Sequence, residues 1–109
     1  MATHAERTLE ILAQLISFDT TSHLSNLNLI SFIEDHLARH GVRSQRIKSD
    51  DRQKSNLLAS IGPDIPGGVV LSGHTDVVPV TGQDWSSDPF LLDTRTVDGA
   101  ERHFGRGTA

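Results

Sequence analysis

The chain contains no cysteine, and this absence limits both its chemistry and its compartment. Without thiols there is no disulfide framework and no thiolate metal site, so any zinc must be held by His, Asp and Glu side chains. Such a composition suits a cytoplasmic protein. No dense Lys/Arg run is present either, and 10 basic against 14 acidic residues give a net charge of −4. We therefore expect small or neutral partners, with no nucleic acid and no membrane.

Long apolar runs are missing from the N-terminus as well. Polar and charged side chains interrupt the apolar residues between Met1 and Phe18, which excludes a signal-peptide core or a membrane span in this stretch. There is no internal repeat, low-complexity tract or interdomain linker. A length of 109 residues is enough for one small domain or for part of one.

Two amphipathic helices are predicted in the first forty residues. Thr3 and Glu6 form a capping-box pattern, and the apolar residues that follow recur at helical spacing, which predicts a helix from about His4 to Ser17. A polar break follows, and then a second apolar stripe predicts a helix over roughly Ser25 to Arg39. His40 and Gly41 supply its C-terminal stop.

From Val42 onward the composition favours strands. We expect strands within Val42–Lys48, Asn56–Ile61 and Gly68–Ser72, separated by turns at Asp50–Lys54 and Gly62–Gly67. Because Val69, Val70 and Leu71 are consecutive, the third strand is predicted to be buried on both faces. Helices followed by such strands indicate an α/β fold in which helices cover a sheet.

His74 and Asp76 follow directly after this third predicted strand. In an extended backbone, residues i and i+2 project to the same face, so the two side chains can approach one site together. An imidazole that binds a metal commonly has a carboxylate as the partner of its other ring nitrogen. Ligands of open α/β sheets also gather beyond the carboxyl ends of the strands. The pair therefore predicts a metal ligand, His74, beside an orienting carboxylate, Asp76, although this dipeptide spacing is also frequent by chance.

Four motifs in order give this pair a wider context. They are SGHTDVVP at 72–79, WSSDPF at 85–90, DG at 98–99 and GRGTA at 105–109. Together they resemble the successive N-terminal motifs of the zinc aminoacylase and carboxypeptidase family of di-zinc metallohydrolases. The two preceding helices fit the same arrangement, so the resemblance extends over essentially the whole chain. Residues 82–90 and 18–22 are most similar to the acetylornithine deacetylase branch.

The resemblance implies a fold and a set of site residues. Residues 1–109 would be the incomplete N-terminal portion of a di-zinc exopeptidase-like catalytic domain, with two helices followed by strands of a mixed central sheet. His74 would bind one of two zinc ions, for which cobalt could substitute, and Asp76 would be the catalytic-site carboxylate that orients it. The bridging aspartate would follow Ala109, within an Asp-Met-Lys-Gly sequence, and the glutamate base and other ligands would come later still.

The function implied is zinc-dependent removal of an N-acyl group from an amino acid such as N-acetylornithine, a step of arginine biosynthesis. The partner would be this small molecule, and a homodimer is an open expectation for the full-length protein. A desuccinylase of the succinyl-diaminopimelate type, or another aminoacylase, is the nearest alternative. A noncatalytic remnant or interaction module is the alternative from another class. The 109 residues alone are expected to be inactive, since a catalytic zinc generally needs three protein ligands.

Other candidate residues receive structural interpretations. His36 and His40 have an i, i+4 spacing that can chelate a metal, but we interpret both as solvent-exposed residues of the second helix. His103 is assigned to a hairpin, and Trp85 and Phe90 to packing rather than a substrate pocket. The remaining candidates are assigned to loops and turns: Asp19, Asp88, Gly105 and Gly107. Nothing in the sequence requires Arg106 to bind a substrate carboxylate.

One departure from the family pattern concerns residues 100–104. Five residues separate Gly99 from Gly105 where the family typically has two or three, which predicts a slightly longer loop at a hairpin tip. If strands of the family's sheet lie outside the chain, a strand edge and apolar helix faces stay uncovered. We then expect poor independent stability and a tendency to associate.

Overall fold

The computed structural model describes residues 1–108, and its first element is helix α1 (His4–Ser17). The predicted capping box is formed: the Glu6 backbone N–H donates to Thr3 Oγ1 at 3.2 Å, and the Thr3 N–H donates to the Glu6 carboxylate at 2.6 Å. Both contacts satisfy N–H groups that a helix start leaves without partners. The bounds predicted for this helix are confirmed.

Helix α2 (Leu27–Arg39) begins two residues later than the predicted Ser25. The Ser25 hydroxyl accepts a hydrogen bond from the Leu27 N–H at 3.2 Å, so Ser25 precedes the helix instead of belonging to it. The predicted stop at its other end is confirmed. Gly41 has φ of +73°, a conformation that glycine adopts without steric cost, and its N–H bonds to the Ala38 carbonyl at 3.0 Å.

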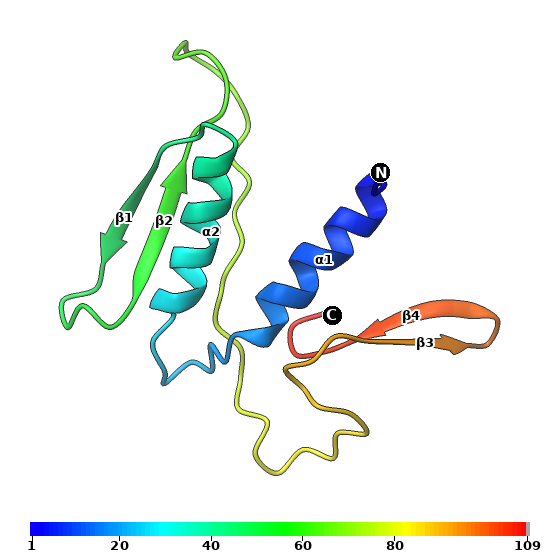
Figure 1. Cartoon of the computed structure of the whole chain (residues 1–109). Helices are drawn as coiled ribbons and strands as arrows, with labels where there is room; N and C mark the ends of the chain where they lie inside the picture. Colours follow the sequence, from blue (N-terminus) through cyan, green and yellow to red (C-terminus); the bar gives the residue numbers. More distant parts are fainter. Residues whose placement is uncertain (109) are drawn as a thin grey trace.

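Strands β1 (Ser44–Lys48) and β2 (Ser55–Ala59) form an antiparallel hairpin. β1 lies within the first predicted segment, and β2 overlaps the second but begins one residue before it. Helix α2 packs on one face of this hairpin (Figure 1). Arg46 of β1 reaches back to the helix, where it forms an ion pair with Glu34 at 2.5 Å and a hydrogen bond with Ser31 at 2.8 Å. The predicted turn between the strands is present at residues 50–53.

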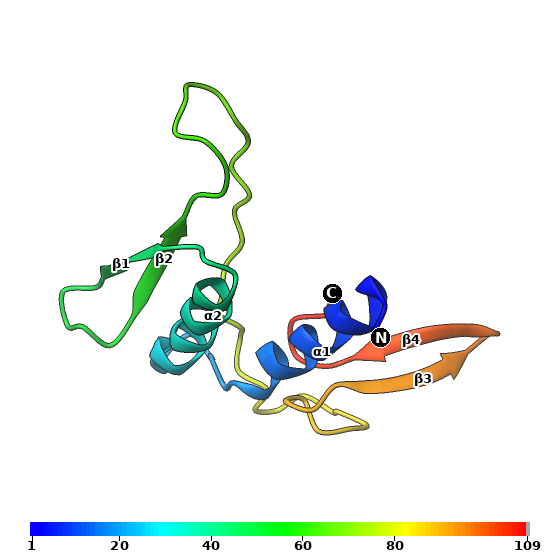
Figure 2. The same cartoon turned by 45° about the horizontal axis from the view of Figure 1, so that its top comes forward.

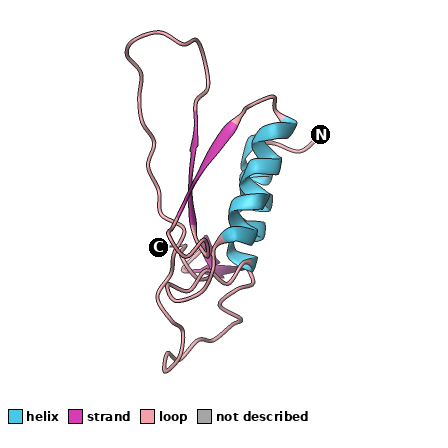
Figure 3. Cartoon of the chain, turned by 90° about the vertical axis from the view of Figure 1, so that its left-hand side faces the viewer, coloured by secondary structure: helices cyan, strands magenta, loops and turns pink. Residues whose placement is uncertain are grey.

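The prediction of a buried strand at Gly68–Ser72 is wrong for the structure as it stands. Val69, Val70 and Leu71 are 87%, 88% and 93% exposed and belong to no ladder. An apolar segment becomes an internal strand only where neighbouring strands satisfy its backbone groups on both sides. Residues 61–70 instead run out and back as an exposed loop away from the helices (Figure 3).

The second hairpin joins β3 (Asp93–Val97) to β4 (Ala100–Phe104). Its tip is only Asp98–Gly99, with φ of +51° and +75°, which matches the left-handed pair that two-residue hairpins require. The longer loop expected at Ala100–Phe104 is therefore wrong, because these residues pair one by one with β3. His103 lies on β4, as the hairpin prediction required.

Across residues 1–108 the fold is α/β in composition, but the strands form two separate antiparallel pairs. The mixed central sheet that the resemblance implied does not form among them. Figures 1 and 2 show two groups of elements: α2 with β1 and β2, and α1 beside the β3–β4 hairpin. The apolar core is small, and its buried members are Ile16, Leu29 and Ile30.

The overall shape is open. The radius of gyration is 16.2 Å, whereas a compact domain of this length has about 13 Å. Neither helix in the described part of the chain is long and apolar enough to cross a membrane.

Candidate metal site at His74 and Asp76

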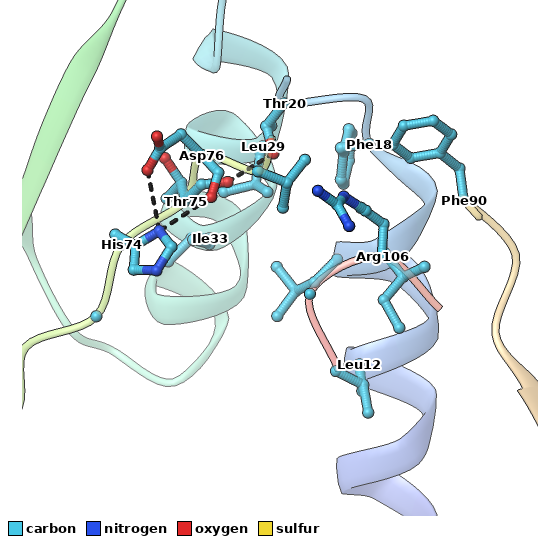
Figure 4. A pocket seen from close by; sticks show the side chains of 15 residues that line it. Leu12, Phe18, Thr20, Leu29, Ile33, His74, Thr75, Asp76, Phe90 and Arg106 are labelled. Atoms are coloured by element: carbon cyan, nitrogen blue, oxygen red, sulfur yellow. Dashed lines mark hydrogen bonds and ion pairs between the residues drawn. The ribbon is translucent and has the colours of Figure 1, made fainter. Parts of the chain in front are cut away.

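His74 and Asp76 meet side chain to side chain, as their spacing predicted. His74 Nδ1 lies 2.9 Å from Asp76 Oδ1 and 2.9 Å from the backbone carbonyl oxygen of the same residue (Figure 4). Both oxygens are acceptors, so the contact is attractive only when Nδ1 carries a proton. The neutral imidazole is then the Nδ1–H tautomer, and its Nε2 lone pair is left for another group.

The exposed position of this imidazole makes that nitrogen accessible. The His74 side chain is 84% exposed and that of Asp76 is 57% exposed. A neutral histidine whose Nδ1–H donates to a carboxylate has the tautomer and orientation that metal-binding histidines use. The pair therefore meets the requirement for one metal ligand and its orienting partner.

The second carboxylate oxygen of Asp76 also has a partner. Ser22 Oγ donates to Asp76 Oδ2 at 3.0 Å. The hydrogen bond from Ser22, followed by that from His74, lowers the pKa of the Asp76 carboxyl below its ordinary value. Both contacts favour the carboxylate form, which is the form that accepts a hydrogen bond from the imidazole N–H.

A polar segment between the helices holds the backbone around this pair. Thr21 and Val77 form an isolated parallel bridge, in which the Ser22 N–H donates to the Val77 carbonyl at 2.9 Å and the Val77 N–H donates to the Thr20 carbonyl at 3.1 Å. The hydroxyl of Thr20 donates to the Thr75 carbonyl at 2.6 Å. Residues 75–77 are thus fixed to the break that follows α1.

Asn26 fixes the same segment from the other side. Its amide exchanges two hydrogen bonds with the Ser55 backbone, both at 2.9 Å, and donates to Thr75 Oγ1 at 3.0 Å. Asn26 is 9% exposed, and one side chain thereby joins the start of α2, the start of β2 and the His-x-Asp segment. The sequence gives no local signal for this role, because an asparagine before a helix predicts only a cap.

A cleft of about 390 Å³ lies beside the pair. His74, Thr75 and Asp76 form one side, and apolar side chains from both helices line the cleft as well, together with Phe90 (Figure 4). Arg106 also lines the cleft, but its Nε and Nη2 donate to the Val78 carbonyl at 3.0 and 2.7 Å. In this arrangement Arg106 fixes the loop after Asp76.

The other histidines lie elsewhere. His36 and His40 neighbour each other at the end of α2, where His40 Nδ1 lies 2.9 Å from the His36 carbonyl. On β4, His103 Nδ1 lies 2.9 Å from Thr94 Oγ1. Residues 1–108 contain no group of three His, Asp or Glu side chains close enough to hold one metal ion.

The remaining motif residues have structural contacts. Asp19 and Asp88 each accept the N–H two residues ahead, as loop carboxylates do. The Trp85 Nε1–H donates to Gln83 Oε1 at 2.8 Å, whereas Phe90 lines the cleft. Ala109, the last residue of the GRGTA motif, lies outside the described residues.

At position 105, steric crowding explains why the residue is a glycine. A Cβ atom at this position would lie 3.1 Å from two side-chain carbons of Ile16. A contact of that length is tighter than ordinary packing, so glycine allows this segment to approach α1. The turn interpretation is confirmed for Gly107, whose φ is +86°.

Comparison with known proteins finds several curated relatives of this chain. The chain is 37% identical to the acetylornithine deacetylase of Pasteurella multocida over 108 residues. This alignment covers 93% of this chain and 27% of that protein. It is 38% identical to the acetylornithine deacetylase of Yersinia pestis over 96 residues, which are 84% of this chain and 24% of that protein. It is also 38% identical to the acetylornithine deacetylase of Edwardsiella ictaluri over 86 residues, which are 78% of this chain and 21% of that protein.

No family model matches the chain, and no solved structure matches it. The chain spans about a quarter of the length of the curated relatives that it matches. Over most of its own length, the chain is a homologue of the acetylornithine deacetylases.

Proposed function

We propose that this chain provides one metal ligand, His74, and its orienting carboxylate, Asp76, to the active site of a zinc-dependent amide hydrolase. The reaction would remove the acetyl group from an N-acetylated amino acid, with N-acetylornithine as the first candidate. The observation that carries the proposal is the contact between His74 Nδ1 and Asp76 at 2.9 Å, which leaves Nε2 accessible beside a cleft. The names of the relatives supply the reaction class.

The residues present fit one coordination position of such a metal. His74 offers a neutral nitrogen, and Asp76 fixes the tautomer and the direction of the ring. Bound zinc would polarise the amide carbonyl and lower the pKa of a water molecule. The bridging aspartate, the glutamate base and the remaining ligands belong, in this proposal, to sequence beyond Ala109, and residues 1–109 are a part of the catalytic domain.

The partners proposed follow the same reasoning. A small N-acyl amino acid agrees with a net charge of −4 and with the absence of a dense basic run. A homodimer and a cytoplasmic location are proposed for the longer protein. A desuccinylase acting on succinyl-diaminopimelate is the alternative within the same reaction class, and comparing initial rates on the two substrates distinguishes them.

The first experiment reads the coding sequence past Ala109. We expect an acidic ligand immediately after Ala109, within Asp-Met-Lys-Gly or an equivalent sequence. The purified longer protein should bind zinc and hydrolyse N-acetylornithine. A continuing frame without any acidic ligand would contradict the proposal. Zinc-dependent turnover by Met1–Ala109 alone would contradict the prediction that this piece is inactive.

A noncatalytic interaction module is the second candidate function. The exposed apolar residues Val69, Val70 and Leu71 favour it, because an unpaired apolar segment can add to the sheet edge of a partner. A stop codon directly after Ala109, with a folded product that neither binds zinc tightly nor hydrolyses N-acetylornithine, would support this alternative.

A further inference from the structure

Ser22 belongs to the polar break between the helices, 54 residues before Asp76 in the chain. Its backbone is held in place twice. The Ser22 N–H donates to the Val77 carbonyl at 2.9 Å, and Lys54 Nζ donates to the Ser22 carbonyl oxygen. The position of the Ser22 hydroxyl is therefore set by the fold and does not depend on its contact with Asp76.

The hydroxyl of Ser22 has two acceptors within reach and one proton to give. Asp76 Oδ2 lies at 3.0 Å and the Val77 carbonyl oxygen at 3.2 Å. The carboxylate is the nearer acceptor and is charged, so it takes the stronger hydrogen bond.

The two oxygens of Asp76 are thus occupied from opposite sides. Oδ1 receives the His74 Nδ1–H, and Oδ2 receives the Ser22 hydroxyl. A carboxylate that is 57% exposed could otherwise rotate about its terminal torsion, which has a broad and shallow preference. With Oδ2 held, Oδ1 stays in the plane that the imidazole needs.

We propose that Ser22 is a positioning residue that acts through Asp76: its hydroxyl orients the carboxylate, and the carboxylate holds His74 as the Nδ1–H tautomer with Nε2 outward. The assignment rests on the proposed function, in which His74 is a metal ligand. A chain of three side chains from two distant segments then sets the direction of the ligand nitrogen. Ser22 touches neither substrate nor metal in this scheme.

The test measures the tautomer of His74, which needs neither metal nor substrate. Imidazole ¹⁵N chemical shifts are recorded on the longer protein proposed above, with metal removed, at about pH 8, where an ordinary histidine is neutral. Comparison with His74→Gln assigns the signals. In the wild-type chain we expect the shifts of a predominant Nδ1–H tautomer at His74, with exposed His4 as an internal reference.

Three variants decide the outcome. Ser22→Ala keeps the backbone contacts and is expected to move the His74 shifts toward those of His4, as does Asp76→Ala. Ser22→Thr keeps the hydroxyl and is expected to restore the wild-type shifts. Ser60→Ala, at an exposed serine after β2, is the matched control and should change nothing.

The opposite results overturn the proposal. Unchanged His74 shifts in Ser22→Ala, together with changed shifts in Asp76→Ala, would show that Asp76 needs no help from Ser22. Wild-type His74 shifts equal to those of His4 would contradict the contact itself. If Ser22→Ala loses its helical circular dichroism, Ser22→Cys replaces it, and the weaker thiol donor should give intermediate shifts.

This readout also separates the inference from the proposed function. A longer protein that binds no zinc but shows the expected tautomer changes would refute the metal role and leave the positioning role standing. If the longer protein binds zinc through His74, but the His74 tautomer does not change in the Ser22 variants, the metal role stands and the positioning role is refuted.

Discussion

At the scale of the residue, the spacing of His74 and Asp76 was enough to predict that they meet. Adjacent positions on one face of an extended segment are a local property. Ser22 and Asn26 could not be found in this way. Their hydrogen bonds to Asp76 and Thr75 join residues 54 and 49 positions apart, and a serine or asparagine near a helix start already has a local explanation.

Asn26 joins α2, β2 and the segment around Thr75, and we expect its replacement to cost more stability than that of any other polar residue there. Asn26→Ala leaves the backbone N–H and carbonyl of Ser55 without their buried partners, at a cost of about 1–3 kcal/mol. Amide hydrogen exchange in β2 should then accelerate about 5- to 150-fold. Asn28→Ala, at an exposed position of α2, is the control. Equal exchange rates in the two variants would show that the junction does not depend on Asn26.

At the scale of the element, structure followed sequence wherever the signal was local. The capping box of Thr3 and Glu6 sets the start of α1, and Gly41 sets the end of α2. Residues 68–72 failed as a strand because a strand is defined by its neighbours. Strand β4 was missed for a related reason: Ala100–Phe104 has no β-type composition, and pairing with β3 makes it a strand.

The packing of α2 on the first hairpin should depend on pH through Glu34. Its hydrogen bond with Arg46 lowers the pKa of the Glu34 carboxyl, so the folded pKa lies below the unfolded one. The contribution of this pair is therefore complete above the unfolded pKa of about 4.3 and is lost as the pH falls through the folded value.

Glu34→Gln should remove this acid sensitivity. Exchange rates of the β1 amide protons, measured from neutral pH to below the ordinary glutamate pKa, are divided by the intrinsic exchange rate at each pH to give the opening constant. As the pH falls, this opening constant is expected to rise more steeply in the wild type than in the variant. Asp35→Asn changes the exposed neighbouring carboxylate and serves as the control. Parallel pH profiles for the wild type and Glu34→Gln would rule out the ion pair as the cause.

At the scale of the whole molecule, the chain exposes the segment that its composition marks as buried. Val69, Val70 and Leu71 lie open to solvent, while the buried apolar residues are Ile16, Leu29 and Ile30. A radius of gyration of 16.2 Å agrees with this open arrangement. So small a core contributes little hydrophobic stabilisation, and exposed apolar segments promote association.

The 109-residue chain is accordingly expected to associate and to unfold without a sharp transition. Sedimentation velocity should show species larger than the monomer as concentration rises, and Val70→Lys should shift the distribution toward the monomer. Arg43→Lys, which leaves the exposed apolar segment intact, should leave the wild-type distribution unchanged. A monomer with one cooperative urea transition would refute this expectation.

The central claim is that His74 binds a metal in the orientation set by Asp76, and zinc affinity tests it most directly. The measurement uses the longer protein proposed above, in competition with a chelator of known affinity. We expect Asp76→Ala to weaken zinc binding about 10- to 100-fold, as loss of an orienting carboxylate does, and His74→Ala to weaken it further. His36→Ala, a histidine on α2, should bind as the wild type does. Wild-type zinc affinity in His74→Ala would contradict the claim.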